Sequence, residues 1–126
     1  MTQVIGHLIN GEMLHTSKNE DTRSQPVFNP ATGEVTKQVA LASKQTVEQA
    51  ISAAQAAFPA WRNTPPHKRA RVMFRFKELL EQNSDKICRL IGEEHGKISH
   101  DAAGELQRGI ENVEYACGAP ELLKGE

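Results

Sequence analysis

Cysteine, aromatic residues and net charge are all scarce in this chain. Its 126 residues include two cysteines, Cys88 and Cys117, which form no C-x-x-C unit, so neither a disulfide framework nor a paired-cysteine metal site is expected. Aromatic residues make up 5% of the chain and many of its apolar residues are alanines, so its apolar faces are shallow. The formal net charge of −1 gives no overall attraction to nucleic acid or to an anionic membrane.

Long apolar runs are missing as well. No segment approaches the length of apolar sequence that crosses a bilayer, and the first residues, MTQVIGHLINGE, lack the basic and then apolar pattern of a secretion signal. We therefore expect a cytoplasmic protein with no membrane partner. The chain also contains no internal repeat, low-complexity tract or linker, which favours a single domain.

The motifs of nucleotide, metal and nucleophilic sites are absent too. No G-x-G-x-x-G unit occurs, and GELQRG is followed by Ile110 and Glu111 instead of the Lys-Ser or Lys-Thr of a phosphate-binding loop. His95 and His100 are five residues apart with a glycine between them, which does not fit the i, i+4 spacing of a zinc-binding helix. On motifs alone we assign no catalytic residue, no cofactor-binding residue and no metal ligand, and the chain is not a complete enzyme.

The N-terminal third of the chain predicts two β-hairpins. Apolar and polar residues alternate around Asn10-Gly11, a pair that tolerates the positive φ angles of a type I′ turn, so we expect strands at about 4–9 and 12–15. The polar segment that follows is expected to be a loop. A second extended pair has a turn at Pro30 to Gly33 between apolar residues at 27–28 and alternating residues at 35–41.

From residue 43 onward, apolar residues recur at the three-and-four spacing of a helix face, which predicts about four helices. Ser43 is expected to cap the first helix, which ends near Pro59 and leaves Trp61 in the connection. Pro65 and Pro66 open the second helix, because the first turn needs no backbone N–H there. The expected apolar faces of these two helices are Val47, Ala50, Ile51, Ala54 and Phe58, and Val72, Met73, Phe76, Leu79 and Leu80.

The third predicted helix, 84–95, stops at Gly96, which suits a left-handed C-cap. Ser99 is expected to cap the fourth helix, which is broken at Pro120. Two hairpins followed by about four helices place the chain in the α+β class. The expected apolar faces of these helices are Ile87, Leu90 and Ile91, and Leu106, Ile110, Val113 and Cys117.

Six basic side chains and no acidic one lie between Arg62 and Lys77. A phosphate-binding surface would have to form here, but no aromatic stacking platform accompanies the window. We interpret it as a solvated helix face whose aliphatic stems cover apolar surface, and we do not expect nucleic acid to bind. The basic residues are Arg62, Lys68, Arg69, Arg71, Arg75 and Lys77.

Arg108 lies inside a predicted helix between two glycines, Gly104 and Gly109. At 100° per residue it is about 200° from Leu106, which is opposite the apolar stripe. One interpretation is a surface ion pair with Glu105 or Glu111, each three residues away. The other is that the glycines leave room for a ligand whose carboxylate is held by the planar guanidinium.

Several segments resemble the N-terminal region of the aldehyde dehydrogenase superfamily in both order and spacing. They are INGE, NPATGEV, AAFPAW, RARVMFRFKELLEQN, EHGK and GELQRGIENVEYACGAPELLKG, and together they cover essentially the whole chain. Within the superfamily, RGIENVEYACGAPELLKG is similar to the CoA-acylating methylmalonate-semialdehyde dehydrogenase branch.

The resemblance implies that residues 1–126 are the N-terminal part of a Rossmann-like α/β NAD-binding domain, with the rest of that domain and the catalytic domain absent. The implied enzyme is an NAD-dependent oxidoreductase and homo-tetramer that converts malonate or methylmalonate semialdehyde to acetyl-CoA or propionyl-CoA. In the family the nucleophilic cysteine and the NAD-holding segments lie beyond the part matched here. Neither Cys88 nor Cys117 therefore inherits the catalytic role, and no cofactor is expected to bind this chain alone. Arg108 matches the arginine of this branch's RGxE helix, which implies a contact with the substrate carboxylate.

Two functions remain open at this point. The chain is either an N-terminal piece of such a dehydrogenase or a non-catalytic interaction module that binds a full-length homologue through its apolar helix faces. In the family fold these helices pack against the remainder of the NAD-binding domain. The isolated chain is therefore expected to expose apolar faces and to be marginally stable or self-associating.

Overall fold

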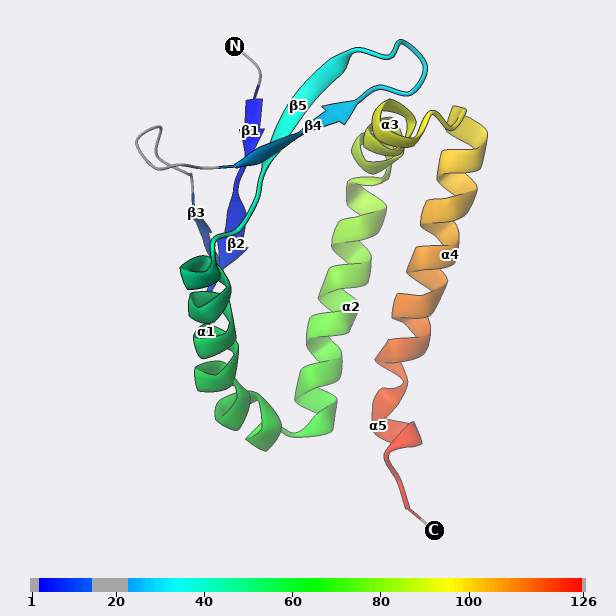
Figure 1. The fold of residues 1–126 in the computed structure, drawn as a ribbon. Helices are drawn as coiled ribbons and strands as arrows, with labels where there is room; N and C mark the ends of the chain where they lie inside the picture. The colour runs from blue at the N-terminus through cyan, green and yellow to red at the C-terminus, as the bar shows by residue number, and fades with distance from the viewer. Residues whose placement is uncertain (1–2, 15–22, 126) are drawn as a thin grey trace. The chain divides into compact units, whose positions relative to one another are not determined.

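A computed structural model describes residues 3–14 and 23–125. These residues divide into two compact units, with the boundary between Ala60 and Trp61, and each is described by itself. The first unit contains the strands and most of the first helix, and the second contains the remaining helices (Figure 1).

The first unit contains two small sheets. In the larger one, β5 (Val35–Ala40) pairs parallel with β1 (Gln3–Ile5) on one side and antiparallel with β4 (Ser24–Phe28) on the other. In the smaller one, β2 (His7–Ile9) pairs antiparallel with β3 (Glu12–Leu14). Both predicted hairpins are therefore present, as β2–β3 and β4–β5.

The prediction of one strand over 4–9 is wrong. The segment is split at Gly6 into β1 and β2, which belong to different sheets and have different partners. The local alternation carried no sign of this change, because the partner of β1 is a strand about 30 residues away in sequence, in the register Gln3 to Lys37. The predicted end of the second strand, at His15, lies outside the described residues.

Both turns have the predicted chemistry. Asn10 and Gly11 adopt φ angles of 53° and 79°, as a type I′ turn requires. In the second hairpin, Gly33 adopts a φ of 73° and its N–H donates to the carbonyl of Asn29 at 2.8 Å. The side chain of Asn29 also accepts a hydrogen bond from the N–H of Ala31 at 2.9 Å.

The first helix, α1 (Lys44–Asn63), begins where predicted and ends later than predicted. The N–H of Thr46 donates to the Ser43 hydroxyl at 3.1 Å, which is the expected N-cap. The helix continues through Pro59, and Trp61 lies in its last turn instead of in the connection. Proline removes one backbone donor, and the alanines around Pro59 are strong helix formers that sustain the helix across the gap.

The second unit is built around α4 (Ser99–Cys117), which packs against α2 (Pro66–Gln82) and α3 (Ser84–His95) (Figure 1). Pro66 opens α2, and Gly96 ends α3 in the left-handed conformation with a φ of 81°, both as predicted. The prediction for Ser99 is off by one residue: Ile98 occupies the N-cap position, and Ser99 is the first helical residue, with no side-chain cap.

The helix break near the C-terminal end of α4 lies at Gly118, not at Pro120. A fifth, short helix, α5 (Ala119–Leu122), follows directly. Pro120 is in its first turn, where a missing N–H is tolerated, so the glycine separates the two helices. The described chain thus has five helices where about four were expected, and the α+β class is confirmed.

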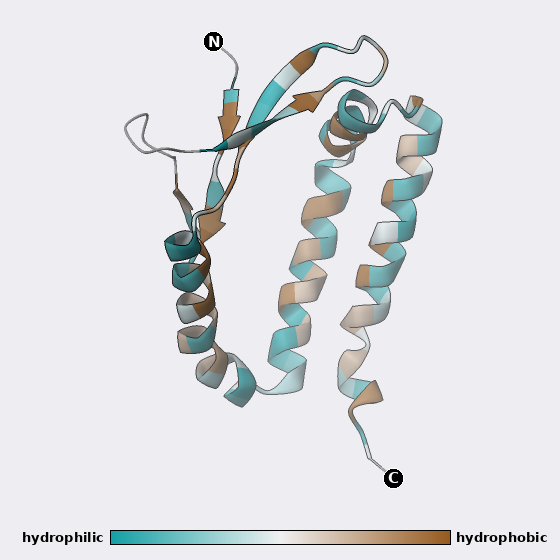
Figure 2. Cartoon of the chain, viewed as in Figure 1, coloured by the Kyte–Doolittle hydropathy of each residue, from teal (hydrophilic) through white to brown (hydrophobic). Residues whose placement is uncertain are grey.

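The apolar stripe of α4 forms the centre of the second unit. Ala102, Ile110 and Cys117 are buried, and Leu106 and Val113 are half-buried, as the period predicted. The face predicted to be buried on α2 is largely open: none of its residues is buried, and Phe76 is 46% exposed. Ala70, the one buried residue of α2, was not part of that face. On α1 no described residue is buried. Apolar residues therefore remain uncovered on several elements (Figure 2).

Candidate functional site

Arg108 projects from the exposed side of α4, opposite the buried stripe that holds Ile110 and Cys117. Neither of the two ion pairs considered for it is formed among the described residues. Glu105 pairs with Lys97, at the start of the connection into α4, and the carboxylate of Glu111 accepts a hydrogen bond from Gln107 at 3.5 Å. The guanidinium is left on an open surface.

The charge around Glu105 is set by its pair with Lys97. The hydrogen bond from Lys97 lowers the pKa of the Glu105 carboxyl, and the more distant positive charges of His95 and Arg108 contribute in the same direction. Glu105, one of the two carboxylates three residues from Arg108, is therefore already engaged by another cation. Arg108 keeps its donors for a different acceptor.

The two glycines that flank Arg108 adjoin open space. A Cβ built on Gly104 or Gly109 meets no atom within 4 Å, so neither glycine is required by packing within the described residues. The side-chain amide of Asn112 donates a hydrogen bond to the backbone carbonyl of Arg108 at 2.7 Å, one turn further along α4. Because Gly104 and Gly109 have no side chains, the exposed Arg108 side chain has open space on both sides of it along the helix.

Two of the six basic side chains in the window on α1 and α2 have carboxylate partners among the described residues. Arg75 pairs with Glu78 at 2.5 Å, and Lys77 pairs with Glu81 at 2.6 Å and with Glu114 of α4 at 3.2 Å. Lys77 donates hydrogen bonds to Glu81 and to Glu114, and both raise the pKa of its ammonium group, the bond to Glu81 more strongly. This pattern fits the solvated face predicted for the window.

Arg69 differs from the other basic residues of the window in its contact with an aromatic ring, which was not predicted from the sequence. Its guanidinium lies over the Trp61 ring, 6.0 Å from the ring centroid, and its Nε atom is buried. A pocket of about 120 Å³ opens beside the pair. Trp61 and Arg69 are eight residues apart, on either side of the α1–α2 connection. Their contact depends on the conformation of that connection, which the sequence pattern does not predict.

The remaining candidates do not assemble a reactive centre. Both cysteines have free thiols, and Cys117 is buried in α4 while Cys88 is half-buried in α3, which fits their interpretation as small core residues. His95 and His100 are exposed at the two ends of the α3–α4 connection. Within residues 3–14 and 23–125, no three histidine, cysteine or acidic side chains converge as metal ligands would. None of the helices described is long and apolar enough to cross a membrane.

Known proteins resemble this chain in sequence and in structure. The sequence model of the aldehyde dehydrogenase family matches residues 16–126. A malonate-semialdehyde dehydrogenase of Pseudomonas aeruginosa is 65% identical over 120 residues, which are 95% of this chain and 23% of that protein. Malonate-semialdehyde dehydrogenase 1 of Geobacillus kaustophilus is 46% identical over 125 residues, 99% of this chain and 25% of that protein.

A solved structure gives the same picture. The crystal structure of methylmalonate-semialdehyde dehydrogenase from Oceanimonas doudoroffii matches with a TM-score of 0.91 and 79% identity, over 100% of this chain and 25% of that one. The chain therefore spans about a quarter of the length of the relatives that it matches.

Proposed function

Because the chain belongs to the aldehyde dehydrogenase family, we propose that it is the N-terminal part of an NAD-dependent, CoA-acylating dehydrogenase of malonate or methylmalonate semialdehyde. The products would be acetyl-CoA or propionyl-CoA, with NAD reduced to NADH and the carboxylate carbon of the substrate released as CO2. Residues 1–126 would form part of the NAD-binding domain, and the catalytic domain would lie in the rest of the protein. This proposal is supported by the names and the identity of the relatives and by the geometry at Arg108.

The observation that carries the substrate class is the guanidinium of Arg108. Malonate and methylmalonate semialdehydes are short molecules with an aldehyde at one end and a carboxylate at the other. A planar guanidinium on an open helix surface, with no ion-pair partner among the described residues, can hold such a carboxylate through two parallel hydrogen bonds. Fixing the carboxylate would orient the aldehyde end towards the reacting groups.

This part of the chain does not fit the cofactor itself. Dinucleotides bind where a glycine-rich turn between strand and helix lets backbone N–H groups reach the pyrophosphate. The strand-to-helix connection in the described residues, 41–43 between β5 and α1, contains Leu, Ala and Ser. NAD supplies hydride acceptance and CoA supplies the acyl acceptor in the proposed reaction, and we assign neither to a residue here.

We assign the catalytic nucleophile to no residue of this chain. Cys117 is 8% exposed and belongs to the packed stripe of α4, so its thiol is not open to a substrate. Cys88 is half-buried on α3, and no other group described here lies beside it as a catalytic base would. Arg108 would thus act as a substrate-positioning residue for chemistry carried out by the remainder of the protein.

We also propose, from the family resemblance, that the longer protein is a cytoplasmic homo-tetramer.

The exposed apolar surface favours a second candidate function. Phe76, Leu79 and Ile51 are among many large apolar side chains that are more than a third exposed. A module with such faces could bind a full-length homologue without catalysing a reaction. Such a module would form a discrete complex with that homologue in size-exclusion chromatography. A dehydrogenase segment would instead support enzyme activity only when it is covalently joined to the remainder of the dehydrogenase.

The proposed function is tested with a chimera in which residues 1–126 replace the matching segment of the Pseudomonas aeruginosa relative. We expect the chimera to form NADH from malonate semialdehyde and NAD in a CoA-dependent manner, with acetyl-CoA detected by mass spectrometry. Release of a free acid with no CoA ester would contradict the CoA-acylating part of the proposal. A folded chimera with no NADH formation would contradict the proposal as a whole.

A further inference from the structure

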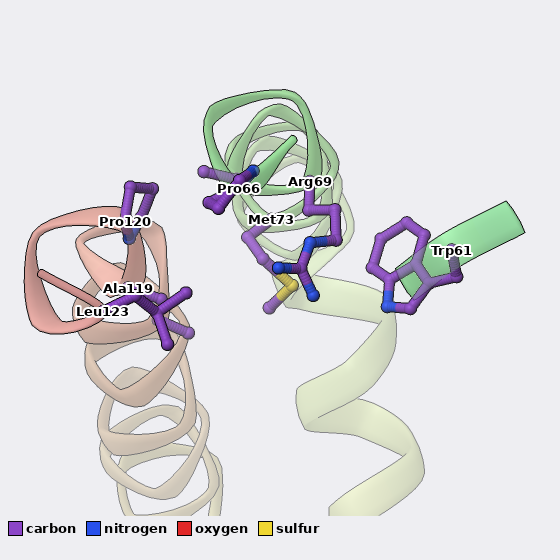
Figure 3. A pocket seen from close by; sticks show the side chains of 9 residues that line it. Trp61, Pro66, Arg69, Met73, Ala119, Pro120 and Leu123 are labelled. Atoms are coloured by element: carbon purple, nitrogen blue, oxygen red, sulfur yellow. The ribbon is translucent and has the colours of Figure 1, made fainter. Parts of the chain in front are cut away.

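The second unit contains a small pocket that the proposed dehydrogenase function does not use. It lies between the last turn of α1, the first turns of α2 and the region where α4 gives way to α5, and its volume is about 120 Å³ (Figure 3). The side chains of Arg69 and Met73 reach into it from α2, with Leu123 on the facing wall and Trp61 beyond Arg69 (Figure 3). The rest of the lining is proline and alanine.

Arg69 is the polar feature of this pocket. Its Nε is buried and has no hydrogen-bond partner within the described part of the chain. The guanidinium also lies over the face of Trp61, an arrangement that holds a cation in place without satisfying its N–H groups. Arg75 and Lys77, which lie further along α2, instead have carboxylate partners. No hydrogen bond or ion pair of the Arg69 guanidinium forms among the described residues, so its Nη groups remain donors for an acceptor in the pocket.

The lining selects the chemistry of that acceptor. The polar side chains present, Arg69 and Trp61, are donors only, and no acidic side chain lines the pocket. Its volume of about 120 Å³ leaves room for a carboxylate on a short aliphatic stem, and the apolar side chains of Met73 and Leu123 favour such a stem.

We propose that this pocket binds an aliphatic carboxylate, which accepts hydrogen bonds from the Nη groups of Arg69 and rests its stem against Met73 and Leu123. The carboxylate could belong to a free short-chain acid or to a glutamate side chain of a polypeptide, and the chemistry of recognition is the same. The site is separate from Arg108, because Arg108 and the pocket residue Ala116 are about 12 Å apart along α4.

The test uses the 126-residue chain and the fluorescence of Trp61, its one tryptophan. Propionate is titrated at pH 7 and constant ionic strength, with chloride as the exchanged ion. We expect a saturable change in Trp61 emission. Arg69→Gln should raise the half-saturating concentration about tenfold or more, because two charge-assisted hydrogen bonds are lost. The matched control Arg71→Gln removes the same charge from an exposed neighbour outside the pocket, and it should leave the titration unchanged.

A second measurement protects the test against a variant that does not fold. The Nε–H resonance of Arg69 is assigned by its loss in Arg69→Lys, and in the unaltered chain it should shift with propionate along the same saturation curve. N-acetylglutamate N-methylamide then separates the two sources of carboxylate. Binding of this blocked glutamate as well as propionate supports a polypeptide carboxylate, and binding of propionate alone supports a free acid.

The proposal is overturned if neither carboxylate produces a saturable change, or if the Arg69 Nε–H resonance does not move. It is also overturned if folded Arg69→Gln responds like the unaltered chain. None of these readouts depends on dehydrogenase activity, so the outcome is independent of the function proposed from Arg108.

Discussion

Replacing Arg108 by glutamine should lower kcat/KM for malonate semialdehyde about 100-fold in the chimera with the Pseudomonas aeruginosa relative. Two hydrogen bonds to a charged carboxylate would be lost, and one such bond contributes about 1.5–3 kcal/mol. A factor of 100 corresponds to about 2.7 kcal/mol, which is close to the lower limit of about 3 kcal/mol for two such bonds. Propanal has no carboxylate, so its kcat/KM should change less than about threefold. Steady-state NADH formation with both aldehydes measures the difference.

Two further variants separate charge from geometry in this experiment. Arg108→Lys keeps the positive charge and loses the planar fork, so we expect an intermediate loss of about tenfold for malonate semialdehyde. Gln107→Ala alters the neighbouring exposed residue and should leave both substrates unaffected. Equal losses for the two aldehydes would indicate a general defect in the protein. An unchanged kcat/KM for both aldehydes would contradict the proposed contact between Arg108 and the substrate carboxylate.

Replacing Ile110 by alanine should lower the free energy of unfolding of the chain by about 2–4 kcal/mol. Ile110 is 5% exposed in α4, the helix against which both α2 and α3 pack. Truncation of a buried isoleucine removes its transfer free energy and leaves a cavity, which together cost about 2–5 kcal/mol. Small domains have total stabilities of about 5–15 kcal/mol, so this is a large share. Urea unfolding followed by circular dichroism measures it.

Val72→Ala is the matched control for the Ile110 variant. Val72 is an apolar residue of α2 that was expected to be buried and is 53% exposed. Its truncation should change the free energy of unfolding by no more than about 0.5 kcal/mol, as is usual at exposed positions. Similar costs at the two positions would mean that the α2 face is covered in solution, for example by self-association. A concentration-dependent midpoint would identify that cause.

Features governed by short-range chemistry were predictable from the sequence. Asn10-Gly11 and Gly33 form the predicted turns, Ser43 caps α1, and Gly96 ends α3, because each depends on the conformational preference or hydrogen bonding of a few adjacent residues. The buried stripe of α4 was also predicted, since the helical period alone fixes which residues share its face.

Features that depend on distant partners were not predictable in the same way. The division of the first extended segment at Gly6 follows from a parallel pairing of β1 with β5, which the local alternation does not encode. The α2 face has the same helical period as the α4 stripe, yet Phe76 and Val72 are exposed, because no element among the described residues covers them. Periodicity predicts which face is apolar, and the presence of a neighbour decides whether it is buried.

The candidate site shows the same limit. The position of Arg108 opposite the apolar stripe followed from the helical angle between residues. Its lack of an ion pair did not, because the partner of Glu105 is Lys97, eight residues away across the start of α4. Arg69 belongs to the same basic window as Arg75, which pairs with Glu78 three residues on. Arg69 has no acidic residue at that spacing, and the α1–α2 connection brings Trp61 beside it.

The most direct test of the account is a paired assay of NADH formation from malonate semialdehyde, NAD and CoA. One sample contains the 126-residue chain alone, and the other contains the chimera at the same molar concentration. We predict CoA-dependent NADH formation by the chimera and none above background by the chain alone. Turnover by the chain alone would contradict the assignment of the catalytic chemistry to the rest of the protein.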